Sequence, residues 1–192
     1  MMPRLVVRLA KAHATGYPLA GRRRWRGLEI SIEAKKGQYR PWRDENGREG
    51  KTLMRYDYGY IRGTEGVDRE PGKKRPDHLD VYVGPYENAR YVYVVHQVRP
   101  DTGEHDEDKV MLGFRSAREA KAAYLAHIPR SYYGGMTRIP AETFVRLARE
   151  GRLRGRVVMG EPLPEARSRE LRTLVEIARK GRLVRVPDGG EA

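Results

Sequence analysis

The 192-residue chain contains no cysteine and no long apolar run. Without cysteine it has no disulfide framework, no thiolate nucleophile and no Cys-ligated zinc or iron–sulfur site. No stretch reaches the roughly 18–20 consecutive apolar residues that span a bilayer, and the first residues lack an apolar core of signal-peptide length. These absences favour a soluble, cytoplasmic protein that has no membrane partner.

Two further absences limit the kinds of active site that the chain can contain. The sequence holds no glycine-rich phosphate loop of the nucleotide-binding kinds and no visible Ser–His–Asp arrangement. His96, His105 and His127 have no partner at the spacing of metal ligands, so we interpret them as structural. Hydrophobic residues make up 39% of the chain and charged residues 34%, a composition that is typical of globular domains and excludes wholesale disorder.

The positive charge belongs to the two ends of the chain. Lys and Arg number 39 against 26 Asp and Glu, a net charge of +13, and residues 1–30 hold seven of the basic residues against one Glu. The run 21–26 has the composition of a basic arm, and one interpretation is contact with nucleic acid through the basic termini. A solvated segment that packs only Trp25 and Leu28 is the alternative.

Alternating residues predict a series of short strands. Between Leu28 and Glu33, apolar residues occupy every second position, as in a strand with one buried face. A polar loop over 43–50 precedes a tyrosine-rich segment, and turn residues separate the later candidates. The further predicted strands are 53–61, 79–83, 91–98 and 109–112. Short strands joined by turns favour a small closed or partly closed barrel.

Helices are expected only after the strands. Ser116 and Glu119 form a capping box that begins a helix over 116–127, and a second helix runs from Pro140 to Gly151. A third, over 164–180, carries an apolar stripe that needs the barrel or another subunit as its partner. The pattern predicts an α+β protein, a small mixed or antiparallel β-barrel with two to three flanking helices. We divide the chain into an N-terminal arm (1–27), a central domain (28–150) and a C-terminal helical extension (151–192).

Carboxylates gather in two segments. Asp68, Asp77 and Asp80 flank or begin a predicted strand, and the run 106–108, Asp-Glu-Asp, stands directly before Lys109. Clustered carboxylates without His or Cys partners suit a hard cation such as Mg²⁺. Such ions polarise phosphoryl oxygens and activate water. The alternative is that these Asp residues serve local hydrogen bonding in turns.

Cations and hydroxyls near these carboxylates suit a polyphosphate. Tyr58 or Tyr60 can donate to phosphate oxygens, although tyrosines at every second position also fit one face of a strand. The basic candidates are Lys36, Arg40, Arg55, Arg62 and Lys109.

Together these segments resemble the soluble, magnesium-dependent inorganic pyrophosphatases, which have an OB-type barrel. The resemblance rests on Tyr58-Gly59-Tyr60-Ile61, on Thr64 and Asp68, and on the segments 77–81 (Asp-His-Leu-Asp-Val), 32–37 (Ile-Glu-Ala-Lys-Lys-Gly) and 106–110 (Asp-Glu-Asp-Lys-Val). It covers about residues 28–115 and is closest to divergent domains of phage and mobile-element proteins. It implies an OB-like fold and, for a phage-encoded protein, the host cytoplasm.

The resemblance also implies residue roles. Asp77 would orient or deprotonate the attacking water, and Tyr58 and Lys109 would contact phosphate, with Lys36 and Arg55 as further substrate ligands. The implied metal ligands for Mg²⁺, or Mn²⁺ in its place, are Glu33, Asp68, Asp77, Asp80, Asp106 and Glu107.

The sequence departs from the family pattern in several places, and two of them affect the candidate metal ligands. Eight residues, 69–76, separate Asp68 from Asp77 where the family has one Gly, which puts the role of Asp68 in doubt. In the second acidic segment Asp101, Glu104 and Asp106 compete for one family position.

We therefore expect metal-dependent hydrolysis of inorganic pyrophosphate, or a close phosphoanhydride, to phosphate by a metal-activated water, in a homo-oligomer. One alternative is a non-catalytic OB-type binding or assembly module that has lost turnover, with a nucleic-acid or phage structural role. The other is a metal-dependent phosphodiesterase or nucleotide hydrolase.

Overall fold

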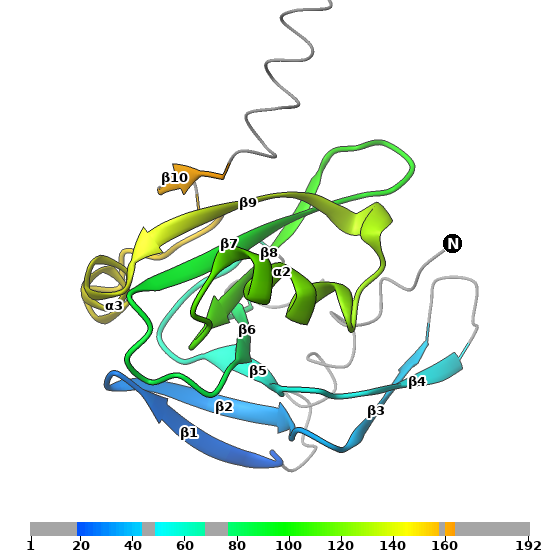
Figure 1. Cartoon of the computed structure of the whole chain (residues 1–192), viewed down its shortest axis with the longest axis horizontal. Helices are drawn as coiled ribbons and strands as arrows, with labels where there is room; N and C mark the ends of the chain where they lie inside the picture. Colours follow the sequence, from blue (N-terminus) through cyan, green and yellow to red (C-terminus); the bar gives the residue numbers. More distant parts are fainter. Residues whose placement is uncertain (1–18, 44–48, 68–76, 158–159, 164–192) are drawn as a thin grey trace, which may run out of the picture.

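The computed structural model describes residues 19–43, 49–67, 77–157 and 160–163 (Figure 1). In this part of the chain most elements are strands. They are β1 (Gly21–Trp25), β2 (Leu28–Ala34), β3 (Tyr39–Arg43), β4 (Glu49–Leu53), β5 (Asp57–Ile61), β6 (Asp80–Val83), β7 (Tyr91–Val98), β8 (His105–Leu112), β9 (Tyr133–Pro140) and β10 (Glu161–Pro162). The helices are α2 (Ala117–Leu125), the 3₁₀ helix η1 (Arg130–Tyr132) and α3 (Ala141–Arg149).

One mixed sheet organises the molecule. Its strand order is β1-β2-β5-β6-β8-β7-β9-β10, and β3 and β4 form a separate hairpin that projects from the body (Figure 1). The pair β6–β8 is parallel, and the other pairs in the sheet are antiparallel. The carboxylates and cations of interest lie along the central strands.

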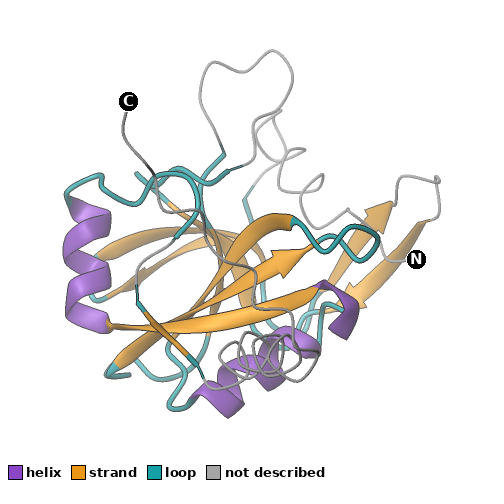
Figure 2. Cartoon of the chain, turned by 90° about the horizontal axis from the view of Figure 1, so that it is seen from above, coloured by secondary structure: helices purple, strands orange, loops and turns teal. Residues whose placement is uncertain are grey.

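The sheet buries apolar side chains on both faces. In β7, Val92 and Val94 point into one core cluster, whereas Tyr93 and Val95 point into the other. Figure 2 shows the two α-helices on different sides of the sheet. Phe144 of α3 belongs to the first cluster, and Tyr124 of α2 belongs to the second.

The sheet is strongly curved around the first cluster. Helix α3 packs against β2 and also against β7 and β9, which stand at the other end of the strand order. A helix can reach both ends only if the sheet bends toward it. A mixed sheet with two α-helices is compatible with the predicted α+β class. Within the described residues no ladder joins the two ends of the sheet, so the predicted closed barrel is not confirmed.

Both helices predicted before residue 152 are confirmed. Ser116 Oγ accepts the backbone N–H of Glu119 at 3.2 Å, as a capping box requires, although the Glu119 carboxylate accepts from the N–H of Arg115 rather than of Ser116. Gly151, with φ of 65°, follows the end of α3. The predicted helix over 164–180 lies outside the described residues.

Several strand boundaries differ from the expectation. The predicted strand 53–61 is two strands, β4 and β5, because Met54 turns aside and exchanges backbone hydrogen bonds with Gly37 and Gln38. Strand β8 begins at His105, so the acidic run 106–108 lies in a strand and not in a turn. Strand β9 was not predicted, because it contains Gly134 and Gly135 and ends in Pro140, and both residue types are uncommon in strands.

Part of the predicted basic arm belongs to the sheet. Residues 21–25 form β1, which pairs with β2, and the Trp25 side chain is buried in the first cluster. The earlier part of that arm, 1–18, lies outside the described residues, and the three-part domain division stays a prediction. The described residues contain no helix long and apolar enough to cross a membrane.

Strand β2 also differs in its burial. The alternation predicted that Ser31 and Glu33 face solvent, but both side chains are buried. This prediction was wrong because the second face of β2 is covered as well, and at Glu33 the covering group is Arg40 from β3. Buried polar atoms normally have hydrogen-bond partners, but among the described residues Ser31 Oγ and Glu33 Oε1 have none.

Candidate functional site

Six polar side chains form a buried cluster on the central strands, which we call the carboxylate–lysine cluster. Each residue is at least nine-tenths buried. The cluster comprises Glu33 (β2), Arg40 (β3), Tyr58 (β5), Asp80 (β6), Glu107 and Lys109 (both β8).

Lys109 lies at the centre of the cluster. Its ammonium group pairs with Asp80 and, at 2.8 Å, with Glu107 Oε2, and it donates to Tyr58 Oη at 3.3 Å. Tyr58 Oη in turn donates to Asp80 Oδ2 at 2.6 Å. An ammonium group has three donors. All three are therefore used within the cluster.

Glu107 is held from its other side by a chain of hydrogen bonds. Gln97 Nε2 donates to Glu107 Oε1 at 2.8 Å, and Tyr124 Oη of α2 donates to Gln97 Oε1 at 3.0 Å. Sequence reasoning missed Gln97 and Tyr124, and only the pairing of β7 with β8 and the docking of α2 bring them to Glu107. The carboxylate is thus fixed in place before any ligand binds.

Glu33 has one fully buried carboxylate oxygen that makes no hydrogen bond to the described residues. Arg40 donates to Oε2 at 3.1 Å, but Oε1 is buried without a hydrogen-bond partner among the described residues. Burial raises the pKa of Glu33 to about 7, since Arg40 and Lys109 offset the burial only in part and Asp80 and Asp77 add to it. A buried carboxylate oxygen with no partner is a natural ligand for a cation.

The other charged groups in the cluster keep defined protonation states. Burial alone would lower the pKa of Lys109, but Asp80 and Glu107 outweigh it and hold that pKa well above its ordinary value. Burial, reinforced by Asp80, raises the pKa of Tyr58, which therefore stays a hydrogen-bond donor. The cluster holds two cations, Arg40 and Lys109, against three carboxyl groups.

The motif residues between 58 and 64 explain why these strands meet so closely. Gly59 lies against β2, where a Cβ atom would come within 1.9 Å of the carbonyl oxygen of Ser31. The β2–β5 register shifts between Ile32 and Ala34, an irregularity at Glu33 itself. Close contact and the register shift together place Glu33 next to Ala34, the residue that pairs with Tyr58.

Thr64 positions the start of β6. Its hydroxyl donates to the carbonyl of Ile61 at 2.6 Å and accepts the N–H of Leu79 at 3.0 Å. These bonds tie the end of β5 to the residue before Asp80. In the parallel pair of β6 and β8, Asp80 then lies opposite Lys109.

The remaining predicted site residues lie around the cluster or away from it. Asp77 is half-buried and close enough for its charge to raise the pKa of Glu33. Asp106 points elsewhere and pairs with Arg99 at 3.7 Å. Lys36 and Arg55 are exposed, with their backbone N–H groups donating to Asp57 and His127. Asp68 lies outside the described residues.

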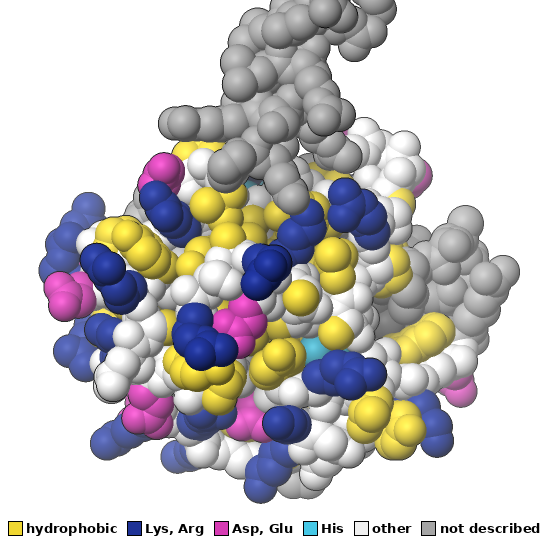
Figure 3. All heavy atoms as spheres, viewed as in Figure 1, with side chains coloured by type: hydrophobic (Ala, Val, Ile, Leu, Met, Phe, Trp, Pro, Cys, Tyr) yellow, Lys and Arg dark blue, Asp and Glu magenta, His cyan; other side chains and the backbone are white. Residues whose placement is uncertain are grey.

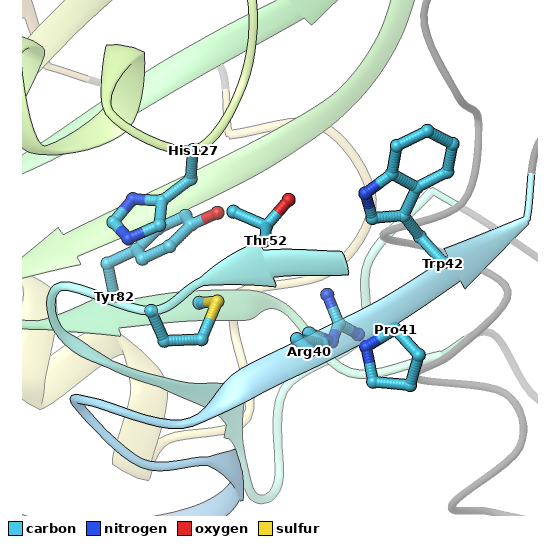
Figure 4. Close-up of a pocket in the computed structure, with 7 residues that line it drawn as sticks. Arg40, Pro41, Trp42, Thr52, Tyr82 and His127 are labelled. Atoms are coloured by element: carbon cyan, nitrogen blue, oxygen red, sulfur yellow. The ribbon is translucent and has the colours of Figure 1, made fainter. Parts of the chain in front are cut away.

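A small surface pocket, open to solvent, adjoins the cluster at Arg40 (Figure 4). Its floor includes Tyr82, whose ring stacks on His127 with centroids 4.9 Å apart and packs 4.8 Å from the ring of Tyr58. The pocket is lined by Arg40, Pro41, Trp42, Thr52, Met54, Tyr82 and His127. Sequence reasoning missed Tyr82 and this pocket, because residues 40–42 and 52–54 come together only through the β3–β4 hairpin.

The donor set fits a hard divalent cation. Glu33, Asp80 and Glu107 offer carboxylate oxygens on one face of the sheet, with Asp77 nearby, and Glu33 Oε1 is available. Oxygen ligands of this kind suit Mg²⁺ and Mn²⁺. The cluster has three carboxyl groups and only two cationic side chains, so a bound cation would improve its charge balance.

Comparisons with known proteins bear on this cluster. A search of curated proteins gives no match, and a search of solved structures gives none either. A family model described as inorganic pyrophosphatase matches residues 10–149, which is more than half of the chain and includes every residue of the carboxylate–lysine cluster. The resemblance read from the sequence is thereby confirmed, and the chain belongs to the inorganic pyrophosphatase family.

Proposed function

We propose that the protein hydrolyses inorganic pyrophosphate, or a close phosphoanhydride, to phosphate with a divalent cation held by the carboxylate–lysine cluster. The observation that carries this proposal is Glu33, a fully buried carboxyl group whose Oε1 lacks a partner beside two further buried carboxylates. Family membership supports hydrolase chemistry of this class. The curvature of the sheet around one core supports the OB-type barrel that the family resemblance implies.

Each side chain has a proposed role. Asp80, Glu33 and Asp77 would hold the cation, which when bound neutralises phosphate charge and lowers the pKa of water. Water attacks one phosphorus in line, the bond from that phosphorus to the bridging oxygen breaks, and Asp77 takes the proton from the water. Asp77 suits this role because it lies at the edge of the cluster and is only half-buried.

The buried cations have different proposed roles. Lys109 uses its three donors on Asp80, Glu107 and Tyr58, so we assign it to orienting the carboxylates rather than to binding phosphate alone. Arg40 lines the solvent-open pocket, and its guanidinium group can meet phosphate oxygens there. The pocket would therefore admit the substrate past Arg40.

The test is phosphate release from pyrophosphate by the full chain with Mg²⁺ or Mn²⁺, with and without a chelator. We expect cation-dependent release that Asp77→Asn and Asp80→Asn abolish, since each loses a ligand charge. Glu87→Gln removes an exposed carboxylate that does not belong to the cluster and is the matched control. Circular dichroism establishes that every variant is folded.

Other outcomes discriminate between the alternatives. No release from a folded protein with Mg²⁺, Mn²⁺ or Co²⁺ overturns the proposal in favour of a binding module. Faster hydrolysis of nucleotides or phosphodiesters than of pyrophosphate favours a phosphodiesterase or nucleotide hydrolase.

Figure 3 shows basic side chains interspersed with acidic ones on the face in view, not gathered in one patch. Nucleic-acid contact through the termini, a homo-oligomeric state and a cytoplasmic location stay predictions from the sequence.

A further inference from the structure

A second polar cluster lies away from the carboxylate–lysine cluster. His96 of β7, His105 at the start of β8 and Asp108 of β8 each present one ligand atom, and these three atoms lie within 4.8 Å of one another. His96 Nδ1 is 2.7 Å and His105 Nε2 is 2.9 Å from the same oxygen, Asp108 Oδ1. We call these three residues the His–Asp cluster.

A strand irregularity creates this cluster. Residues three apart in a regular strand point to opposite faces, so His105 and Asp108 would not meet. The ladder pairs His96 with Asp108 and Val98 with His105, which leaves one extra residue in β8 between the two pairs. This bulge turns His105 onto the face of Asp108. Bulges of this kind re-aim side chains, here toward a common centre.

Asp108 is held in one orientation. Its side chain is fully buried, and its second oxygen, Oδ2, accepts the backbone N–H of Val157 at 2.6 Å. Oδ1 is therefore directed at the two imidazoles. Both histidine side chains keep about one-seventh of their surface exposed, at 14% and 16%, so the cluster opens to solvent on one side.

A hydroxyl group supports His96 from behind. Thr137 Oγ1 of β9 lies 3.2 Å from His96 Nε2. Without a cation, His96 Nδ1–H donates to Asp108 and Nε2 accepts from the hydroxyl; because a hydroxyl can either donate or accept, Thr137 also fits the tautomer in which Nε2 carries the hydrogen and Nδ1 is left to bind a cation. Metal-binding histidines generally have such an outer partner on the second nitrogen.

From this geometry we propose that His96, His105 and Asp108 form a binding site for a borderline divalent transition-metal ion such as Zn²⁺. Two imidazole nitrogens and one carboxylate oxygen are a ligand set that Zn²⁺ accepts, with the solvent side left for a fourth ligand. Zn²⁺ ligands at about 2.0–2.1 Å stand roughly 3.3 Å apart in a tetrahedron, so the two nitrogen–oxygen distances of 2.7 and 2.9 Å would each widen by about half an ångström.

The ion would stabilise structure rather than take part in hydrolysis. Adjacent strand residues point to opposite faces, so Asp108 faces away from Lys109 and its cluster. Through Asp108 the site joins β7 and β8 to the segment at Val157, beyond α3. We therefore expect Zn²⁺ to raise the melting temperature of the full chain, since a ligand of the native state stabilises it by mass action.

Co²⁺ provides a direct probe, because its visible absorption reports nitrogen ligands and low coordination number. The metal-free full chain is titrated with Co²⁺ in excess Mg²⁺, which occupies oxygen-ligand sites. We expect a visible band that saturates at about one equivalent and is displaced by Zn²⁺. His96→Gln and His105→Gln should each abolish it, and Thr137→Val should weaken Zn²⁺ affinity by about 10- to 100-fold.

Matched variants separate this site from the other one. His78→Gln removes a histidine whose ring stacks on Tyr60 and which lies outside the cluster, so the band should persist. It should also persist in Asp80→Asn, whatever happens to phosphate release. His105 is partly exposed, so we expect His105→Gln to stay folded. This holds even if a substitution of the fully buried Asp108, such as Asp108→Asn, unfolds the protein. A wild-type protein with no saturable band, or a band unchanged in folded His96→Gln and His105→Gln, overturns the proposal.

Discussion

Asp80 on β6 and Lys109 on β8 lie directly opposite each other in a parallel strand pair, and their side chains form a buried ion pair. Lys109 also pairs with Glu107, so one ammonium group compensates two carboxylates. Each carboxylate depends on Lys109 for its charge balance inside the protein. Removing the single cation therefore affects both.

Lys109→Met should destabilise the fold severely. The variant leaves Asp80 and Glu107 without their shared cation, and breaking a buried ion pair by removing one partner typically costs about 3–5 kcal/mol. Urea unfolding of wild type and variant at pH 7 measures the difference. Lys51→Met, which removes an exposed lysine that lies over the Tyr39 ring, is the control and should cost less than about 1 kcal/mol. A similar small loss in Lys109→Met would contradict the assigned role.

Stability without divalent cations should fall as the pH rises through the range in which Glu33 ionises. Burial raises its pKa from 4.5 to about 7, so the folded state favours the protonated form. This contribution is fully present below pH 4.5 and is lost as the pH approaches 7, for a total of about 3 kcal/mol.

Urea unfolding at a series of pH values, with a chelator present, measures this slope. Glu33→Gln has no proton to lose at that position, so its stability should change less between pH 4.5 and 7. Equal slopes for the two proteins would show that Glu33 does not titrate in this range.

Gly59→Ala should disturb the packing of β5 on β2. An added Cβ would stand 1.9 Å from the backbone oxygen of Ser31, and backbone in a central strand cannot move aside cheaply. We expect a loss of about 3 kcal/mol or more in the free energy of unfolding, measured by urea denaturation. Gly66→Ala is the matched control, because its nearest contact would be an ordinary 3.4 Å. Equal stabilities of the two variants would be inconsistent with the close strand contact.

Tyr58→Phe removes one hydroxyl group from the carboxylate–lysine cluster, which donates to Asp80 and accepts from Lys109. The variant keeps the ring between Tyr82 and Arg40, with centroid distances of 4.8 Å and 4.2 Å, but it loses the hydroxyl that donates to Asp80. A hydrogen bond to a charged group contributes about 1.5–3 kcal/mol, and the variant should lose stability in that range. Thermal unfolding compares it with Tyr60→Phe, whose ring stacks on His78. A Tyr58→Phe protein as stable as Tyr60→Phe would argue against the bond to Asp80.

Short-range signals in the sequence were sufficient for part of the fold. The capping box at Ser116, the turn at Gly151 and the apolar runs of 79–83 and 91–98 depend on neighbours within a few positions, so α2, α3, β6 and β7 could be predicted. The motif from Tyr58 to Asp80 also identified the family, because the order of its residues is distinctive.

The sequence by itself therefore determined several of the local elements, the family and the list of candidate cation ligands. Only the tertiary structure decided which of them meet. Glu33 and Lys109 are buried because a second layer covers the strands, and Asp106 is turned toward Arg99 by its strand register. The bulge in β8 joins His105 to Asp108 against the expected alternation. These outcomes depend on pairing between distant segments, and a one-residue shift in register reverses the face on which each side chain lies.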